Sequence, residues 1–312
     1  MRRYVALIAM ALVIAGVLTG CHPLFDASNK VISVYASFYP IYALTEAVLR
    51  DVPNTELHQL TQPQDGCLRS YQLSDWDMYL LSAGADAVIM GGRGLESFES
   101  ALFAWGDGGP AVSAVLYNME LYDPGGKVDG ESESHLKGAN PHLYMSLDGA
   151  ANMIEGISAT MQSLDPGYAE VYAGNAAQAI ERLQALRRQL MERFEPFEGR
   201  RVILMNEALI YPALDYGLEI ADWIDRESGE ALYDDALSDC LERMKASGAR
   251  VALIEKQAPQ PFVEALETAG FVVARLDVFS AHFEGRGFED YIDIQTANAQ
   301  ALREVMDRED AA

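Results

Sequence analysis

The chain has 312 residues, of which 50% are hydrophobic and 22% charged, and its formal net charge at pH 7 is −24. Such acidity argues against binding of nucleic acid or of an anionic lipid surface, because both carry negative charge. It is compatible with concentrating cations, and equally with solubility alone. The composition is globular, and the length beyond the first thirty residues exceeds the usual size of one core, which predicts two lobes.

The N-terminus has the features of a cleaved export signal. Arg2 and Arg3 form a positive start, residues 4–17 are almost entirely apolar, and Leu18-Thr19-Gly20-Cys21 follows. The apolar run is at the short limit for spanning a bilayer and no stop-transfer cluster follows it, which disfavours an uncleaved membrane helix. The ending resembles the bacterial lipobox. We therefore expect a signal peptide over 1–20, a lipidated tether over 21–30, and an extracytoplasmic protein anchored to the cell membrane through Cys21.

Short apolar, β-branched runs recur along the rest of the chain, with stretches of helical periodicity such as 41–49 and 75–81 between them. In the first half the predicted strands are 31–36, 56–60, 85–90 and 111–117. In the second half they are 201–205, 219–224, 251–254 and 271–276. Strands that alternate with helices predict parallel sheets in an α/β fold.

A long helix is predicted between the two halves. Asp165-Pro166-Gly167 opens it, and apolar residues keep helical spacing to about Phe194. We therefore expect an N-terminal α/β lobe over 31–164, a bridging helix over 165–195, and a C-terminal α/β lobe over 196–312. Ligands of open α/β sheets bind beyond the carboxyl ends of the strands, so the default site is a cleft between the lobes.

An ordered series of short motifs runs along both halves of the chain. In the first half they are Ser37-Phe38-Tyr39-Pro40-Ile41-Tyr42, Gln72-Leu73-Ser74, Ala85-Asp86, Gly94-Leu95-Glu96 and Asn140-Pro141-His142-Leu143-Tyr144. Later ones are Asp165-Pro166, Tyr172, Asn175, Tyr211, Tyr216-Gly217, Leu276-Asp277, Tyr291 and Asn298. Together they resemble the zinc/manganese-type (cluster A-I) substrate-binding lipoproteins of metal ABC importers, and the resemblance covers nearly the whole chain after Cys21. It implies two pseudo-symmetric α/β lobes, bridged by one long helix as in periplasmic binding proteins.

The resemblance also implies a metal site with four ligand positions, two from each lobe. Two of them keep a ligand, His142 in the first lobe and Asp277 at the end of the last strand. At the other two, Arg69 stands in place of a histidine and Asn206 in place of the third ligand. A guanidinium has no lone pair for a metal and stays charged, so Arg69 is expected to repel a cation and to pair with a carboxylate.

Other residues near these positions favour metal binding. Glu207 follows the altered third position, and Cys67 precedes Arg69 by two residues. Both also have structural interpretations, Glu207 as a cap or salt-bridge partner and Cys67 in a disulfide with Cys240, which an oxidising compartment favours. His142 itself admits a structural interpretation. His135 in the acidic loop 129–137 is best explained as a solvated residue, and His58 and His282 give no functional signal.

The function implied by the resemblance is that of a lipid-anchored substrate-binding protein that delivers zinc or manganese to an ABC importer permease, and not of an enzyme. The alternative is a divergent lipoprotein with a degenerate site that binds another small ligand or acts in adhesion or sensing. A hydrolase is disfavoured because no G-x-S-x-G, H-E-x-x-H, P-loop or G-x-G-x-x-G motif occurs in the expected context. We expect a monomer that binds no nucleic acid.

Overall fold

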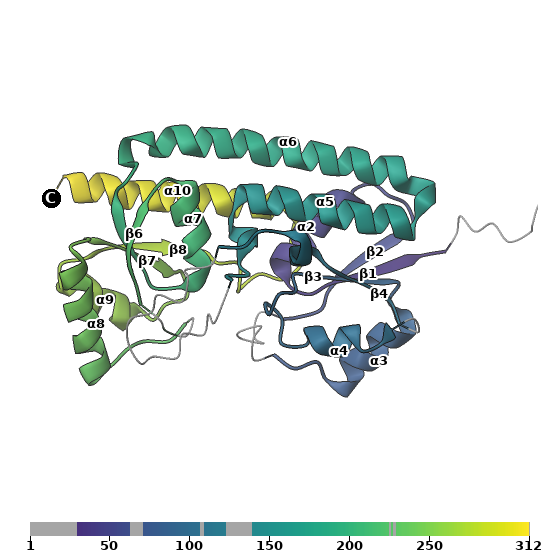
Figure 1. Ribbon diagram of the computed structural model, residues 1–312, viewed down its shortest axis with the longest axis horizontal. Coiled ribbons are helices and arrows are strands. Elements are labelled where there is room, and N and C mark those ends of the chain that lie inside the picture. The colour runs from purple at the N-terminus through teal and green to yellow at the C-terminus, as the bar shows by residue number, and fades with distance from the viewer. Residues whose placement is uncertain are drawn as a thin grey trace, which may run out of the picture.

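The computed structural model of the chain describes residues 30–62, 71–106, 109–122, 139–224, 226 and 229–311. Figure 1 shows two α/β lobes side by side under a layer of long helices. This arrangement confirms the predicted fold class. The signal segment, Cys21, Cys67, Arg69 and His135 lie outside the described residues.

The first lobe contains a parallel sheet with strand order β2-β1-β3-β4. Its register places Val34 of β1 beside Leu57 of β2 and Ala87 of β3. Strand β3 is buried at all four residues, which explains its uninterrupted apolar sequence. The strands are β1 (Ile32–Ala36), β2 (Thr55–Gln59), β3 (Ala87–Met90) and β4 (Ala111–Ala114).

The second lobe repeats this topology, with strand order β6-β5-β7-β8 and parallel pairing throughout. The equal order of the two sheets is the pseudo-symmetry that the sequence resemblance implies. All eight predicted strands are present; the one predicted over 111–117 ends at Ala114, where the chain turns into the 3-10 helix η4 (Val115–Asn118). The strands are β5 (Arg201–Leu204), β6 (Glu219–Trp223), β7 (Val251–Glu255) and β8 (Val272–Leu276).

The predicted bridging helix is α6 (Ala169–Phe194), preceded by the 3-10 turn η6 (Pro166–Tyr168). The Tyr172 hydroxyl donates to the Asp165 carboxylate at 3.0 Å, which fastens the start of the helix. Its buried stripe is Tyr172, Ala176, Ala179, Leu183, Leu190 and Phe194. The helix ends at the 3-10 turn η7 (Glu195–Phe197), where Pro196 cannot continue a helical hydrogen-bond ladder.

The junction between the lobes is wider than one helix. The long helices α5 (Leu147–Leu164) and α10 (Phe288–Asp310) run with α6 above the sheets, and α2 (Tyr39–Leu49) lies beneath them (Figure 1). One continuous buried cluster includes Leu44 of α2, Ile157 of α5, Leu183 of α6, Leu204 of β5 and Leu302 of α10. The two lobes therefore share a hydrophobic core along the helical layer.

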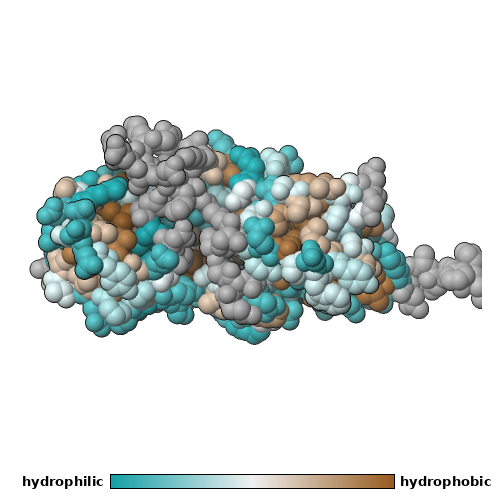
Figure 2. Space-filling model, turned by 90° about the horizontal axis from the view of Figure 1, so that it is seen from below, coloured by the Kyte–Doolittle hydropathy of each residue, from teal (hydrophilic) through white to brown (hydrophobic). Residues whose placement is uncertain are grey.

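A smaller hydrophobic cluster lies under the outer helices of each lobe. The first-lobe cluster is beneath α3 and α4, and the second-lobe cluster is beneath α8 and α9. Seen from below the view of Figure 1, hydrophilic residues line much of the rim of the second lobe, and hydrophobic residues gather over part of the first lobe (Figure 2). Within the described part of the chain no helix has the length and apolar character of a membrane span. The remaining elements are α3 (Asp75–Gly84), α4 (Glu99–Phe103), η5 (Leu143–Met145), η8 (Glu207–Leu209), α7 (Ile210–Asp215), α8 (Asp234–Ser247) and α9 (Gln260–Thr268).

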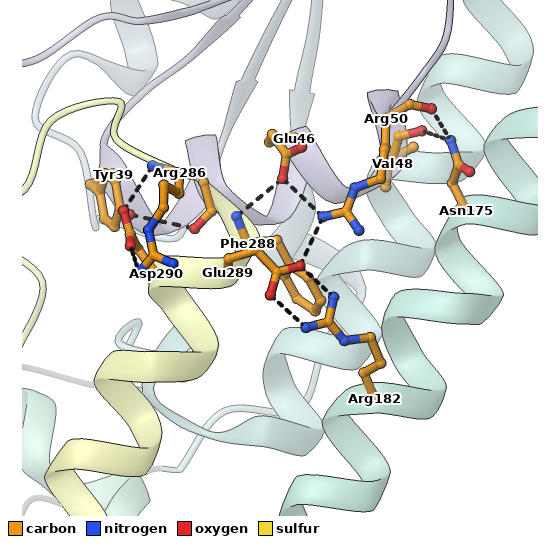
Figure 3. Close-up of polar contacts among 11 residues, drawn as sticks. Tyr39, Glu46, Val48, Arg50, Asn175, Arg182, Arg286, Phe288, Glu289 and Asp290 are labelled. Carbon is orange, nitrogen blue, oxygen red and sulfur yellow. Dashed lines mark hydrogen bonds and ion pairs between the residues drawn. The ribbon is translucent and has the colours of Figure 1, made fainter.

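A polar cluster fixes the start of α10 to the first lobe (Figure 3). Glu289 of α10 receives two hydrogen bonds of 2.7 Å from Arg182 of the bridging helix and lies 3.5 Å from an Arg50 nitrogen. Glu46 of α2 accepts from the backbone N–H of Phe288 at 3.1 Å, which satisfies one of the unpaired donors at the helix start. The second-lobe helix α10 is thus held to first-lobe helix α2 and to α6.

Candidate metal-binding site

The candidate site lies where the strands of the two sheets end, and the first-lobe side is built around a buried carboxylate. Glu96 is 1% exposed and accepts from the Ser37 hydroxyl at 2.6 Å and from the backbone N–H groups of Gly91 and Gly92 at 2.8 Å each. Burial raises the pKa of Glu96, and these hydrogen bonds oppose the rise. Glu96 therefore joins the chain after β1 to the turn after β3. The Gly-Leu-Glu motif has a structural role here.

His142 precedes η5 and is oriented by Asn140, which is fully buried. The Asn140 amide nitrogen donates to the Glu207 carbonyl at 2.8 Å, so its Oδ1 is the atom that faces the His142 backbone N–H and Nδ1, both at 2.9 Å. An amide oxygen only accepts, so Nδ1 donates to Asn140, and Nε2 is the ring nitrogen that faces away from Asn140. A metal would bind to this histidine through Nε2, with Asn140 as the supporting partner.

The Glu207 carboxylate of the second lobe lies opposite that nitrogen. The His142 Nε2 atom lies 3.4 Å from Glu207 Oε1, and both side chains are largely buried. The neighbouring Asn206 has another task, because its Oδ1 accepts from the Ala208 N–H at 3.0 Å and caps η8. The cap is thus formed by Asn206, and Glu207 is the residue whose carboxylate faces His142.

A buried ion pair lies behind Asn206, and the sequence analysis did not identify it. The Asn206 amide nitrogen is 3.4 Å from Glu255 Oε2, the same oxygen that pairs with Arg226. Glu255 also accepts from the Gly229 N–H at 2.8 Å, and the Arg226 guanidinium lies 5.3 Å from the centre of the Phe262 ring. Removing either charge would leave the other buried, so this pair is a structural support of the third ligand position.

Asp277 follows β8 and is held on both sides by Asn298 of α10, through hydrogen bonds of 2.7 and 2.8 Å to its backbone. Its Oδ1 accepts from the Phe279 N–H at 2.8 Å, and Lys256 Nζ lies 3.7 Å from Oδ2. Burial raises the pKa of Asp277, but the hydrogen bonds and positive charges of its partners outweigh it, and the pKa is lowered. The carboxylate is therefore ionised and attracts cations.

The structure adds His282, which the sequence analysis did not select as functional. Its Nε2 atom lies 3.0 Å from Asp277 Oδ2, and its ring lies 5.1 Å from the Tyr39 ring and 6.4 Å from that of Phe279. The only available sequence signal was a histidine five residues after the aspartate that ends the last strand.

The described donors thus form two nitrogen–oxygen pairs, His142 with Glu207 and His282 with Asp277. Ring contacts of 5.8, 6.2 and 6.4 Å lead from His142 through Tyr144 and Phe279 to His282. No three His, Cys, Asp or Glu residues in the described ranges are grouped closely enough to hold a metal ion. With Arg69 outside those ranges, its convergence with His142, Asn206 and Asp277 stays a prediction.

Cys240 lies in α8, and its surroundings are hydrophobic. It is a free thiol buried among the side chains of the second-lobe cluster, 3.6 Å from the Met244 sulfur, and burial raises its pKa to about 11. A thiol in such surroundings is inert. Cys67 lies outside the described residues, so the structure does not test the predicted disulfide, which stays a prediction.

Imidazole nitrogens and carboxylate oxygens are donors that suit Zn²⁺ and, where carboxylates prevail, Mn²⁺. Two ligands of a tetrahedral Zn²⁺, each about 2.0 to 2.1 Å from the ion, are about 3.3 Å apart. The separations of 3.4 and 3.0 Å within the two pairs are close to that value. Each pair therefore has the composition and spacing of half a metal site.

Comparison with solved structures supports the fold. The Ni²⁺ complex of the substrate-binding protein FpvC from Pseudomonas aeruginosa superposes with a TM-score of 0.74 at 20% identity, covering 90% of this chain and 98% of that one. The Zn(II)-bound ZnuA-like domain of AdcA from Streptococcus pneumoniae gives 0.73 at 23% identity, covering 88% and 98%.

Curated relatives are similar over most of this chain. The zinc-binding lipoprotein AdcA of Streptococcus pneumoniae serotype 4 is 26% identical over 306 residues, which are 95% of this chain and 60% of AdcA. The high-affinity zinc uptake system protein ZnuA of Bacillus subtilis is 22% identical over 298 residues, 89% of each chain. This chain thus spans about 60% of the length of AdcA.

The profile of the family described as zinc-uptake complex component A, periplasmic, matches residues 34–305. The match runs from the first strand to the last helix and includes every element that carries a residue of the two donor pairs. The chain belongs to the zinc-uptake complex component A family.

Proposed function

We propose that this chain is the extracytoplasmic, lipid-anchored substrate-binding protein of an ABC importer, and that its cargo is Zn²⁺ or Mn²⁺. One observation carries the proposal. The Nε2 atom of His142 in the first lobe lies 3.4 Å from Oε1 of Glu207 in the second lobe. A cation bound between them would join the two lobes, which is the action expected of a protein that carries its cargo between them.

The names of relatives agree with this chemistry and leave the metal open. AdcA is named a zinc-binding lipoprotein, and a relative from Halalkalibacterium halodurans is named a manganese-binding lipoprotein. In this chain each pair supplies one imidazole and one carboxylate. Arg69, at the predicted place of a histidine, adds positive charge and removes a donor, so Zn²⁺ should bind more weakly than to a site with a full histidine set.

Metal content and titration test the proposal. The full-length chain, purified in detergent without chelator, should contain about one Zn²⁺ or Mn²⁺ per chain, and the metal-stripped protein should take up one ion in calorimetry. His142→Ala and Glu207→Gln should each weaken binding at least about tenfold, since even residues behind the ligands contribute that much. Protein that takes up neither ion would refute the proposal.

The second candidate is a degenerate site that binds another small ligand. It is favoured by the absence of a three-donor group within the described ranges and by Lys256 beside Asp277. The same titration separates the two, because this candidate predicts no stoichiometric uptake of Zn²⁺ or Mn²⁺ by the stripped protein.

The anchor and the partner belong to the proposal as well. We propose that the signal over 1–20 is removed, that Cys21 is acylated, and that the protein delivers its cargo as a monomer to the permease of its importer. Mass spectrometry of membrane-extracted protein should find a lipidated cysteine at the N-terminus. An intact Met1 would refute the anchor without affecting the metal site.

A further inference from the structure

The loop that follows β8 belongs to the second lobe by sequence but is fastened to the first. Gln59, the last residue of β2, donates to the His282 carbonyl at 3.3 Å and accepts from the Glu284 N–H at 3.0 Å. The Tyr39 hydroxyl donates to the Gly287 carbonyl at 3.4 Å. These contacts use the backbone of the loop, so they fix its path whatever side chain stands at position 282.

The two carboxylate oxygens of Asp277 have different neighbours. Oδ1 accepts a hydrogen bond from the backbone N–H of Phe279, two residues later, at 2.8 Å. Oδ2 faces His282 Nε2 at 3.0 Å, with Lys256 at 3.7 Å. Lys256 is 68% exposed, so its ammonium is a mobile surface charge that a divalent ion can replace.

A cation that binds to Oδ2 therefore lies close to His282 Nε2. A Zn²⁺ or Mn²⁺ ion must approach that oxygen to about 2.0 to 2.2 Å, and an Nε2 atom 3.0 Å from the oxygen is then at the distance of a second ligand. The alternative is that the ion drives the imidazole away. That would cost the ring its contact with Tyr39 and exchange a nitrogen ligand for water.

A plain His–Asp hydrogen bond is the competing explanation of the same distance. Against it stands the position of the pair, at the end of the last strand of the second sheet, where the family resemblance implies a ligand at Asp277. His282 is also 32% exposed at its side chain, and a hydrogen bond there adds little stability in reach of water.

We infer that His282 is a ligand of the cargo cation, binding through Nε2 beside Asp277 Oδ2 and supplying an imidazole that the altered positions 69 and 206 no longer provide. This inference rests on the proposed function, because it assigns a further donor to the same cargo. It gives the second lobe a nitrogen ligand in addition to its carboxylates.

Two substitutions at position 282 separate a ligand from a hydrogen-bond partner. His282→Ala removes both roles, and His282→Gln keeps a donor for Asp277 but is a poor metal ligand. The matched control is His58→Ala, which removes a partly exposed histidine whose Nε2 lies 3.8 Å from a Glu56 carboxylate oxygen on β2. Zn²⁺ affinity of the full-length chains is measured by competition with a chelator, and the imidazoles around bound Zn²⁺ are counted by X-ray absorption spectroscopy.

Both position-282 variants should bind Zn²⁺ at least about tenfold more weakly than wild type, and the imidazole count should fall by one. The His58 variant should match wild type in both measurements. Unchanged affinity and imidazole count in both variants would overturn the inference and leave the proposed function intact. Weak binding by the Ala variant alone would also overturn it, in favour of a hydrogen-bond role. Wild-type protein that binds neither Zn²⁺ nor Mn²⁺ would instead refute the proposed function itself.

Discussion

His142 Nε2 and Glu207 Oε1 lie 3.4 Å apart although the two residues come from different lobes. Asn140 orients the His142 imidazole and also donates to the Glu207 carbonyl at 2.8 Å. One buried amide therefore positions both residues of the contact. The Tyr211 hydroxyl donates to the Asn140 carbonyl at 2.6 Å and completes the frame. Donor atoms held in this way need little rearrangement to receive a cation.

Asn140 should therefore control metal affinity without touching the metal. Asn140→Asp keeps an oxygen acceptor for His142 Nδ1 but loses the donor to the Glu207 carbonyl, so it should weaken binding less than Asn140→Ala does. Asn140→Ala removes both the acceptor and the donor and should weaken Zn²⁺ binding by about 10- to 100-fold. Chelator competition measures the affinities, and thermal unfolding of the metal-free proteins reports any loss of fold. Equal affinities for the Ala variant and wild type would show that Asn140 does not set the tautomer.

Replacing Arg69 by histidine should strengthen Zn²⁺ binding. Arg69→His removes a positive charge and restores an imidazole at the predicted first position, so Zn²⁺ should bind at least about tenfold more tightly. Adding Asn206→His should tighten binding further but cost about 1 kcal/mol of stability, because the η8 cap on the Ala208 N–H is lost. Calorimetry and chemical denaturation give the two quantities. No gain for Arg69→His would place residue 69 outside the site.

The ion pair of Arg182 and Glu289 should contribute more than an ordinary surface pair. Its two parallel hydrogen bonds of 2.7 Å join the bridging helix to the start of α10, and Arg50 adds a second cation (Figure 3). A double-mutant cycle with Arg182→Ala and Glu289→Ala should give a coupling free energy of about 1 kcal/mol, decreasing at high salt. The pair of Arg303 and Asp307 within α10 is a control, with an expected coupling of about 0.3 to 0.5 kcal/mol.

Much of the fold follows from local sequence pattern, because buried parallel strands are continuous apolar runs. The eight strands and the long helix could be found in this way. The role of His282 could not be predicted, since its orientation depends on Gln59, 223 positions earlier in the chain. The Arg226–Glu255 pair likewise has no periodic signal. The family resemblance indicated His142, Glu207 and Asp277 as candidates, but which donor faces which is decided by long-range packing.

Gly174 offers a stabilising substitution in the bridging helix. A Cβ at this position meets nothing within 4 Å, and glycine in a helix interior costs about 0.5 to 1 kcal/mol relative to alanine. Gly174→Ala should raise the free energy of unfolding by about that amount. The contrasting control is Gly149→Ala in α5, where the new Cβ would lie 2.3 Å from the Leu143 carbonyl oxygen. That variant should be destabilised. A Gly174→Ala protein less stable than wild type would indicate a contact on this face of α6.

Asp215 should make the protein less stable as the pH rises from about 4 to 6. This residue ends α7 and accepts from the Leu147 N–H at 3.3 Å, and burial raises its pKa from 3.8 to about 6. Between these values the folded protein binds more protons than the unfolded chain, so stability is greatest below the unfolded pKa and falls as the pH rises through the folded one. Asp215→Asn, which cannot ionise, should remove this decrease and be about 2 kcal/mol more stable than wild type at pH 7.5. Urea unfolding of the metal-free proteins at pH 4.5 and 7.5 measures both effects. An equal pH dependence of wild type and variant would show that Asp215 ionises normally in the folded protein.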